Sequence, residues 1–573
     1  MEQLARRIKI AGGDEPADLL LRGGRVVSVH TGTIMECEVA LAGGEVAALG
    51  TGYAAHATVE LNGAFLAPAF IDAHIHIESS MATPREFARA VVPRGTGTVV
   101  ADPHEIANVQ GAAGVRWMLE AARALPLSIA IMAPSCVPAT HLETAGAALS
   151  PEDIAALLAE PGVLGLAEMM NFPGVIHRDP AVLAKLVAAG ARPIDGHAPG
   201  LAGRELAAYA AAGIQTDHEC TTLAEAEAKL ALGLRVMIRE GSSARNLAAL
   251  VRGVTPANAR RWLLCSDDRT PADLLHEGHV DHLLRRCVEE GLDPLLALQM
   301  ATLNAAEHFG LADRGAIAPG RRADLVVLED LVSFKVRQVY RAGRLVAEGG
   351  ALLEEPAASP PPASAGLNLG ALSATPFAIP DRGAARVRVI VAAGDQLLTE
   401  EAIETPRREG GFLVADRARD LLKLAVVERH RGTGNVGLGF IRGFGLARGA
   451  LASTVAHDSH NLIILGASDR AMEVALAAMR ELGGGKLVAD ESGVLAALPL
   501  PVGGLMSDAP IAETAAGLER LAAAARALGC ALPEPFMTLS FMALPVIPKL
   551  KLTDKGLVDV EVFAVCELTP ESH

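Results

Sequence analysis

Two different patterns of apolar and polar positions follow one another along this chain. From Asp18 to about Leu66, short runs of Val, Leu and Ala are separated by glycine pairs at Gly23-Gly24 and Gly43-Gly44, which is typical of a small β unit. From Phe70 to about Gly310, short apolar strands that end in polar residues alternate with helical stretches rich in Ala and Leu. The second pattern predicts repeated strand–helix units of the α/β class.

Eight strand–helix units are predicted in this second region. The expected strands are the apolar run before His74 and the segments Thr96 to Ala101, Ser128 to Ala133, Val163 to Glu168, Pro193 to His197, Ile214 to His218, Arg235 to Ile238 and Trp262 to Ser266. Eight such units in about 240 residues match a (β/α)8 barrel. An open doubly wound sheet is less consistent with the sequence, because no phosphate-binding glycine loop is present.

The segments on either side of the barrel predict further domains. Strand signals from about Leu325 to Leu352 could complete the N-terminal β unit, and a run rich in Pro, Ala and Ser follows them. We therefore expect a composite β-sandwich from residues 1–68 and 311–355, the barrel at 69–310, a linker at 356–366, and a C-terminal α+β domain at 367–573 that could act as a lid.

Composition narrows the class of protein. The 573 residues suffice for two to four domains. The formal charge of −16, with no basic block, argues against nucleic-acid and anionic-membrane partners. We find neither an uncharged apolar run of about 20 residues nor a secretory signal. The seven cysteines form no C-x-x-C pair and are expected to be reduced, so we expect a cytoplasmic protein.

Candidate metal ligands stand where the predicted barrel strands end. These positions are His74 and His76 after strand one, Asp102, His104 and Glu105 after strand two, Glu168 at strand four, Asp195 and His197 after strand five, Asp217, His218 and Glu219 after strand six, and Ser266, Asp267 and Asp268 after strand eight. Barrel enzymes carry their chemistry at this edge, and residues two apart on a strand share one face. A structural histidine remains the alternative for any single position, but the joint placement favours a metal site.

Four imidazoles and two carboxylates match the needs of two ions held close together. Glu168, at the middle strand, can bridge the ions, and Asp267 can hold one ion while accepting a proton from bound water. Paired ions lower the pKa of such a water and supply hydroxide near neutral pH. The predicted chemistry is hydrolysis.

Several motifs together resemble one enzyme family. They are FIDAHIHIESSM at 70–81, ADPHE at 101–105, PSCVPAT at 134–140, DGHAPG at 195–200, CSDDRT at 265–270 and HDSHN at 457–461. This set resembles the amidohydrolase superfamily and, within it, the adenine deaminase family, over essentially the whole chain. Two positions depart from the family pattern: Ala69 replaces a usual Gly, and His141 replaces a usual Pro near the strand-three loop, where it could alter substrate fit.

The resemblance implies a site and a reaction. The implied metal ligands are His74, His76, the bridging Glu168, His197, His218 and Asp267, and the implied cofactor is a binuclear pair of Mn²⁺ or Fe²⁺. Zn²⁺ stays open, because imidazole and carboxylate suit all three metals. A metal-activated hydroxide would attack C6 of adenine and release ammonia to give hypoxanthine, in purine salvage. Glu219 would protonate N1 or else orient His218, and Asp267 would pass a proton to the leaving amine.

Other candidate residues keep two interpretations. His104 and Glu105 could contact the substrate or an extra ion, or could close a loop by hydrogen bonds. Arg239 and Arg269 could orient purine acceptors, or could form salt bridges. The segment 457–461 could cover the barrel mouth, or could be a capped turn.

Alternatives to this function and the oligomeric state remain to be weighed. The substrate could instead be an N6-substituted adenine. The reaction could also be that of a cyclic amide hydrolase, although that group often bridges its ions with a carboxylated lysine and the fourth strand here ends in Glu168. A non-enzymatic scaffold would show broken ligands, and none is broken. A homo-oligomer, either dimer or tetramer, is expected from this apolar-rich chain.

Overall fold

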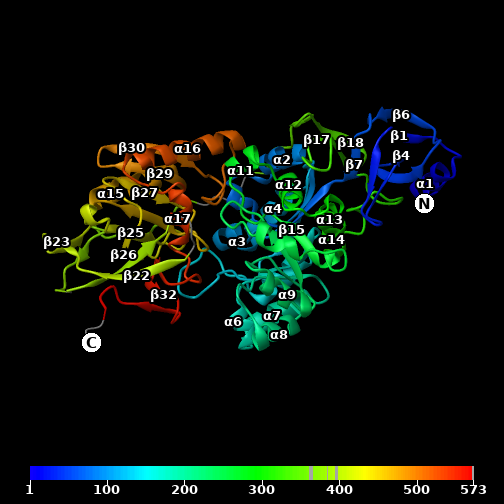
Figure 1. Cartoon of the computed structure of the whole chain (residues 1–573). Helices are drawn as coiled ribbons and strands as arrows, with labels where there is room; N and C mark the ends of the chain where they lie inside the picture. Colours follow the sequence, from blue (N-terminus) through cyan, green and yellow to red (C-terminus); the bar gives the residue numbers. More distant parts are fainter. Residues whose placement is uncertain (361–365, 384, 394–397, 571–573) are drawn as a thin grey trace.

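The computed structural model describes residues 1–360, 366–383, 385–393 and 398–570. In Figure 1 the chain passes from an N-terminal β unit, drawn in blue, through a central body of parallel strands and helices to a C-terminal lobe drawn from yellow to red. The predicted linker at 356–366 lies partly outside the described residues, because 361–365 are not among them.

The N-terminal β unit begins with one helix and is built from strands of two distant segments. The helix is α1 (Glu2–Gly12), and the strands are β1 (Ala17–Arg22), β2 (Arg25–Ser28), β3 (Thr33–Met35), β4 (Glu38–Ala42), β5 (Glu45–Gly50), β6 (Ala55–Glu60), β7 (Phe65–Pro68), β16 (Leu325–Leu328), β17 (Val336–Arg341), β18 (Arg344–Glu348) and β19 (Ala351–Leu352). They form a four-stranded sheet β5-β4-β1-β6 and a seven-stranded sheet β19-β18-β17-β16-β7-β2-β3. Antiparallel pairing of β7 with β16 joins the two segments.

The apolar run before His74 is two strands, where the sequence predicted one. β7 ends at Pro68 in the seven-stranded sheet, and β8 (Phe70–Ile75) belongs to a parallel sheet. Ala69 lies between them, and its backbone N–H donates to Asp324 O at 2.9 Å. A continuous apolar run carries no signal of a change of sheet, because both strands are buried. His74 therefore lies within β8.

Eight parallel strands make up the central body. They are β8, β9 (Thr96–Ala101), β10 (Ser128–Ala133), β11 (Val163–Met169), β12 (Ile194–Gly196), β13 (Thr216–Asp217), β14 (Arg235–Arg239) and β15 (Trp262–Cys265). Five form the sheet β12-β11-β10-β9-β8 and three form β13-β14-β15. At one junction Asp267 N donates to His74 O at 3.0 Å, and at the other Gln215 N donates to Ile194 O at 2.9 Å. The two sheets therefore adjoin at both edges.

Helices separate these strands along the chain. They are α2 (Pro84–Val91), α3 (His104–Gln110), α4 (Ala112–Ala122), α5 (Pro151–Leu158), α6 (Phe172–Ile176), α7 (Pro180–Ala189), α8 (Gly203–Ala211), α9 (Leu223–Ala231), α10 (Leu247–Leu250), α11 (Pro271–His276), α12 (Val280–Glu289), α13 (Pro294–Met300) and α14 (Leu303–His308), with the 3-10 helices η1 (Ile77–Ser80), η2 (Val92–Arg94), η3 (Val251–Gly253) and η4 (Ala259–Arg261). Side-chain caps begin several of them. Ser150 and Asp153 form a reciprocal capping box at α5.

Gly165 shows how tightly β11 packs against the next strand. A Cβ at this position would lie 2.1 Å from Pro193 O and 3.0 Å from Met132 Cε. We expect Gly165→Ala to destabilise the protein by about 1–3 kcal/mol, because the neighbouring backbone cannot move aside without strain. Thermal unfolding measures the change, with Gly12→Ala near the end of α1 as the control, where the added Cβ meets only Asp14 Oδ2 at 3.5 Å. Equal melting temperatures for the two variants would contradict this packing.

The C-terminal lobe contains one large sheet, two small sheets and several helices. Its strands are β20 (Ile379–Pro380), β21 (Val387–Ala392), β22 (Thr399–Glu404), β23 (Arg407–Glu409), β24 (Phe412–Val414), β25 (Leu422–Val427), β26 (Val436–Arg442), β27 (Ala450–Ser453), β28 (Leu462–Gly466), β29 (Gly485–Asp490), β30 (Gly493–Pro499), β31 (Leu550–Thr553), β32 (Gly556–Asp559) and β33 (Ala564–Cys566); its helices are η5 (Arg417–Arg419), α15 (Asp469–Leu482), α16 (Ile511–Ala527) and α17 (Pro535–Phe541). Eight strands form the large sheet, in the order β22-β21-β26-β25-β28-β27-β29-β30.

The C-terminal lobe contacts loops at the carboxyl ends of the parallel strands. Ser507 N donates to Met81 O at 2.8 Å. Asn461 Nδ2 donates to Thr144 O at 2.8 Å. Met81 follows β8 and Thr144 follows β10, so the lobe lies at the edge where barrel enzymes carry their chemistry. One hydrophobic cluster continues from the central body into this lobe, which indicates that the lobe is an integral part of the fold.

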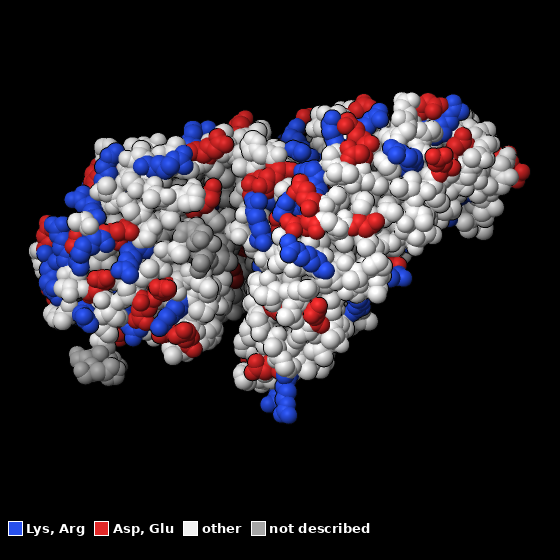
Figure 2. Space-filling model, in the orientation of Figure 1, with Lys and Arg blue, Asp and Glu red and all other residues white. Residues whose placement is uncertain are grey.

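The surface carries charges of both signs. Figure 2 shows Lys and Arg interspersed with Asp and Glu on the face drawn, and a notch between the C-terminal lobe and the central body at the lower edge of this view. None of the helices in the described part of the chain combines the length and apolar character needed to cross a lipid bilayer.

Candidate metal centre

Two imidazoles at the end of β8 lie close together. His74 and His76 are almost fully buried, and their Nε2 atoms lie 3.1 Å apart. His76 Nδ1 donates to Asp102 O at 2.9 Å, so in the neutral ring Nε2 carries a lone pair directed at the cluster. A metal-binding histidine commonly donates its other ring nitrogen to a carbonyl or carboxylate in this way.

Glu168 stands at the centre of the cluster. Its carboxylate lies 3.3 Å from His76 Nε2, 2.6 Å from His197 Nδ1 and 3.3 Å from His218 Nε2. Burial alone would raise the pKa of Glu168, but His197, His218 and His76 outweigh it and hold that pKa well below its usual value. The carboxylate is therefore ionised and reaches histidines from three different strands.

Asp267 completes the cluster from the end of β15. Its Oδ1 atom lies 3.2 Å from His76 Nε2 and 3.5 Å from His74 Nε2. The backbone at Asp267 has a φ of 54°, an uncommon left-handed conformation that is several-fold enriched in Asp. Such conformations concentrate at functional sites, because the surrounding structure must hold them in place. Burial opposes ionisation of Asp267, yet Arg239 and the two histidines keep its pKa well below its usual value.

The donor set fits divalent metal. The possible ligand groups within 4.8 Å include His74, His76 and Asp267 together and, separately, His74, Glu168 and His218. Burial lowers the pKa of His76, but hydrogen bonds to Asp267 and Glu168 raise it well above its usual value. His218 follows the same pattern beside Glu168 and Glu219. The ionised carboxylates therefore favour a positive charge among these imidazoles. A bound divalent cation would supply that charge while the imidazoles stay neutral.

Glu219 and Arg239 form a second layer against the cluster. Glu219 Oε1 lies 3.4 Å from His218 Nε2. Arg239 Nη1 donates to Glu219 Oε1, its Nη2 donates to Glu219 Oε2 at 2.9 Å, and Nη1 also donates to Asp267 Oδ2 at 2.8 Å. Burial would raise the pKa of Glu219, but His197 and Arg239 lower it well below its usual value. Arg239 therefore holds two ionised carboxylates in fixed positions.

Two other candidate residues, Arg269 and His141, contact groups outside the cluster. Arg269 is fully buried, and its Nη2 donates to Glu277 Oε2 at 2.9 Å and to Gly278 O at 3.0 Å. This geometry favours the salt-bridge interpretation over substrate contact. His141 is exposed, and its ring packs edge-on against Phe563 at 5.7 Å, so it shapes the contact between the central body and the C-terminal lobe.

His104 and Glu105 take two different directions from the start of α3. His104 Nδ1 lies 3.2 Å from Asp102 Oδ2 and 3.4 Å from Glu168 Oε1, which places it beside the cluster. Glu105 faces the C-terminal lobe, where its Oε1 lies 3.1 Å from His457 Nδ1. The sequence predicts a lid or a capped turn at 457–461 and carries no signal of this pairing, because 352 positions separate the two residues.

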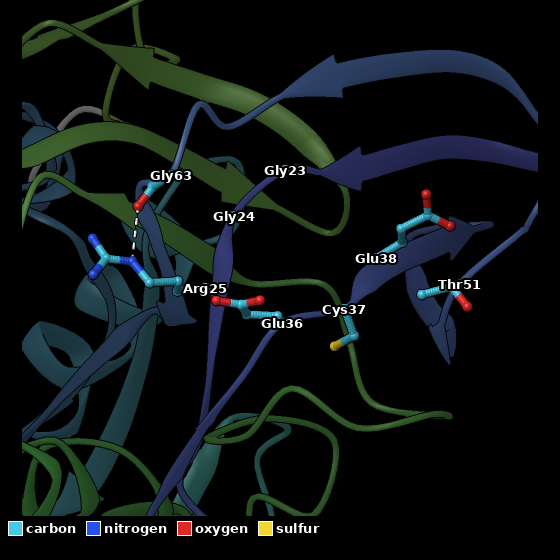
Figure 3. A pocket seen from close by; sticks show the side chains of 8 residues that line it. All are labelled: Gly23, Gly24, Arg25, Glu36, Cys37, Glu38, Thr51 and Gly63. Atoms are coloured by element: carbon cyan, nitrogen blue, oxygen red, sulfur yellow. Dashed lines mark hydrogen bonds between the residues drawn. The ribbon is translucent and has the colours of Figure 1, made fainter.

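A pocket in the N-terminal β unit is separate from these residues. Its volume is about 410 Å³, and Figure 3 shows Arg25 Nε donating to Gly63 O beside it. The lining residues are Gly23, Gly24, Arg25, Glu36, Cys37, Glu38, Thr51 and Gly63. It shares no residue with the cluster, so it is not the candidate site.

Comparisons with known proteins identify the class and the family of this chain. Residues 65–346 match the model of the amidohydrolase family, and residues 396–564 match that of the adenine deaminase C-terminal domain. Among solved structures, dihydropyrimidinase from Brevibacillus agri shares 14% identity over 59% of this chain and 96% of its own, with a TM-score of 0.46. The match over residues 65–346 identifies the central body as that of an amidohydrolase, a class of metal-dependent hydrolases.

Full-length relatives identify the family within this class of hydrolases. An adenine deaminase of Desulfatibacillum aliphaticivorans is 51% identical over 97% of this chain and 98% of its own length. An adenine deaminase of Methanothrix thermoacetophila is 49% identical over the same shares. The chain belongs to the adenine deaminase family.

Proposed function

We propose that this protein hydrolyses adenine to hypoxanthine and ammonia. The observation that carries the proposal is the buried cluster of His74 in β8, His76 directly after it, Glu168 in β11 and Asp267 after β15, whose ligand atoms belong to overlapping groups. The full-length similarity to adenine deaminases supports adenine as the substrate. A small purine is the partner, and purine salvage is the proposed setting.

Six residues are proposed to hold a binuclear metal pair. They are His74, His76, Glu168, His197, His218 and Asp267, with Glu168 as the bridge, because its two oxygens face different histidines. Divalent ions bound there would lower the pKa of a water molecule and supply the nucleophile near neutral pH. We propose Mn²⁺ or Fe²⁺ for the pair, and Zn²⁺ suits the same donors.

Two carboxylates are proposed to move the protons. Glu219 is held as a carboxylate by Arg239, so it can take the first proton of the attacking water and deliver it to N1 of adenine. Asp267 takes the second proton from the new C6 hydroxyl and passes it to the leaving amine. The water oxygen stays on C6, one proton ends on N1, and the other leaves with ammonia, so the reaction balances.

Arg239 is proposed as a positioning residue. We expect Arg239→Met to lower turnover of adenine by about 100-fold, because Glu219 and Asp267 lose the group that fixes them and small misplacements are costly. Metal content should stay near that of the unmodified protein. Arg269→Met is the matched control, because Arg269 is as deeply buried but pairs with Glu277, and its turnover should be preserved. Equal losses in the two variants would refute the role of Arg239.

The substrate is tested by product analysis. Protein reconstituted with Mn²⁺ is incubated with adenine, N6-methyladenine and adenosine, and ammonia or methylamine is measured beside the purine product. We expect one hypoxanthine and one ammonia per adenine. Faster conversion of N6-methyladenine would favour the alternative substrate class, and conversion of a cyclic amide such as dihydroorotate alone would reassign the reaction.

The finer architecture is also a proposal. The two parallel sheets adjoin at both edges, which supports a closed (β/α)8 barrel over residues 69–310. Residues 1–68 with 311–355 would form the composite β-sandwich, and 367–573 the C-terminal domain. All seven cysteines are free thiols, which suits the reducing cytoplasm. The homodimer or tetramer expected from the sequence remains part of this proposal.

A further inference from the structure

The C-terminal lobe brings a carboxyl group to the candidate site that nothing in the reaction has yet used. Asp458 is 5% exposed, and its Oδ2 atom has no hydrogen-bond partner among the described residues. A buried polar atom without a partner is costly to leave unsatisfied, so each case in a folded protein calls for an explanation. An absent ligand is one such explanation.

Asp458 lies beside the residues that follow β9. Its Oδ1 atom lies 3.9 Å from His457 Nδ1, and His457 Nδ1 lies 3.1 Å from Glu105 Oε1. Burial raises the pKa of Asp458, while the charges of His104 and His457 lower it. Glu143, a second buried carboxyl, lies in the loop after β10. Asp458 is therefore a buried carboxyl of the C-terminal lobe at the strand-two end of the central body.

The position of the segment that carries Asp458 is fixed on both sides. His457 Nδ1 lies 3.1 Å from Glu105 Oε1, and the His457 ring stacks on Phe541 at 4.8 Å with an interplanar angle of 16°. Asn461 Nδ2 donates to Thr144 O at 2.8 Å. Figure 1 shows α17, which contains Phe541, on the side of the C-terminal lobe that faces α3. The segment 457–461 is thus held against the strand-two end of the central body.

The shape of adenine decides which of its atoms reach this side. The residue proposed for N1, Glu219, follows β13, and Glu105 follows β9, four strands away in an order of eight parallel strands. Strands four apart lie on opposite sides of an eight-stranded barrel. Across the purine from N1 lies the five-membered ring. With N1 at Glu219, that ring points toward the end of β9 and the segment 457–461.

We propose that Asp458 binds the five-membered ring of the substrate by accepting the N9–H of adenine, and so selects the free base over N9-substituted purines. The inference rests on the proposed adenine deamination. A carboxyl oxygen without a partner is complementary to an N–H donor, and an N9 substituent removes that donor. Sites that pair a buried polar group with a substrate N–H reject analogues that lack it, because the protein group is then left unpaired. The lobe would supply specificity while the central body supplies the chemistry.

The test compares adenine with 9-methyladenine in the full-length, Mn²⁺-reconstituted protein and in Asp458→Asn. Adenine kcat/KM is measured, and 9-methyladenine is measured as a substrate or as a competitive inhibitor. We expect Asp458→Asn to lower adenine kcat/KM by about 10-fold, mainly through KM, because the N9–H then donates to a neutral amide oxygen, a weaker acceptor than a carboxylate. Binding of 9-methyladenine should change by less than about 3-fold, so the preference for adenine falls.

The control is Glu143→Gln, which makes the same carboxyl-to-amide change in an equally buried residue of the loop after β10. Its preference for adenine should match that of the unmodified protein. An unchanged preference in Asp458→Asn, with metal content and melting temperature retained, would overturn the inference. If Asp458→Asn loses metal or folds poorly, Asp458→Ser serves instead, and an unchanged preference for adenine in that folded, metal-bound variant would overturn the inference in the same way. Failure of the unmodified protein to convert adenine would instead reject the proposed function.

Discussion

Replacing His74 and His76 together by alanine is expected to remove bound metal and adenine turnover at once. Both Nε2 atoms face the same point 3.1 Å apart, and each also faces Asp267, so the pair anchors one side of the cluster. Without a metal the protein loses the group that makes a nucleophile from water near neutral pH. We expect kcat to fall by at least about 10⁴-fold. The loss of the nucleophile should cost more than the loss of one general acid–base group, which costs about 10²–10⁴-fold.

Elemental analysis and turnover are measured on the same preparation of the double variant. His141→Ala is the control, because that histidine is exposed and packs on Phe563. It should keep its metal and its activity. Retention of two ions per chain in the double variant would show that these histidines are not the ligands.

Glu219→Gln is expected to lower turnover by about 10²–10⁴-fold, the usual contribution of a proton-transfer group, while metal content changes little. The amide keeps the size of the side chain and can still accept from Arg239, but it cannot carry a proton to N1. Its effect should appear in kcat more than in KM, because proton transfer occurs in the transition state.

The competing interpretation of Glu219 predicts a different pattern. If Glu219 mainly orients His218, whose Nε2 lies 3.4 Å from Glu219 Oε1, metal affinity and turnover should fall together. A metal titration of the Glu219→Gln variant separates the two roles. Equal losses would reassign Glu219 as a residue that orients a ligand.

The candidate metal ligands could be found in the sequence because their positions follow a simple rule. Strands of a parallel sheet end at one edge, so residues such as His74, Glu168 and Asp267 could be grouped from the ends of apolar runs alone. The strands themselves were also predictable: β9 and β10 occupy the expected ranges Thr96–Ala101 and Ser128–Ala133. Apolar runs with clear turn residues on both sides leave little choice of strand limits.

Contacts between distant segments could not be predicted in the same way. The sequence leaves two interpretations open for Arg239 and favours a salt bridge for Arg269 because Asp268 is its neighbour, but it does not identify the partners; the structure places Arg239 beside Glu219 and Arg269 beside Glu277. The pairing of Glu105 with His457 depends on how the C-terminal lobe packs on the loops of the central body. Hydrophobic periodicity describes the face a residue presents to its own element and carries no information on which distant segment covers it.

The change of sheet at Ala69 was missed for a related reason. β7 and β8 are both buried and apolar, so the boundary between them left no polar signal, and only the hydrogen bond from Ala69 N to Asp324 O marks it. The helix α1 could not be predicted from the apolar pattern either. It is short and mostly exposed, and Ile10 is its one buried residue, so its apolar stripe is weak.

The central claim is that one buried cluster holds a pair of ions that serve adenine hydrolysis. It is tested most directly by titrating metal-free protein with Mn²⁺ and measuring the rate of adenine conversion after each addition. The account predicts a rate that rises until two ions are bound per chain and then stays constant, with no conversion before metal is added. Full activity in the metal-free protein, or saturation at one ion per chain, would contradict it.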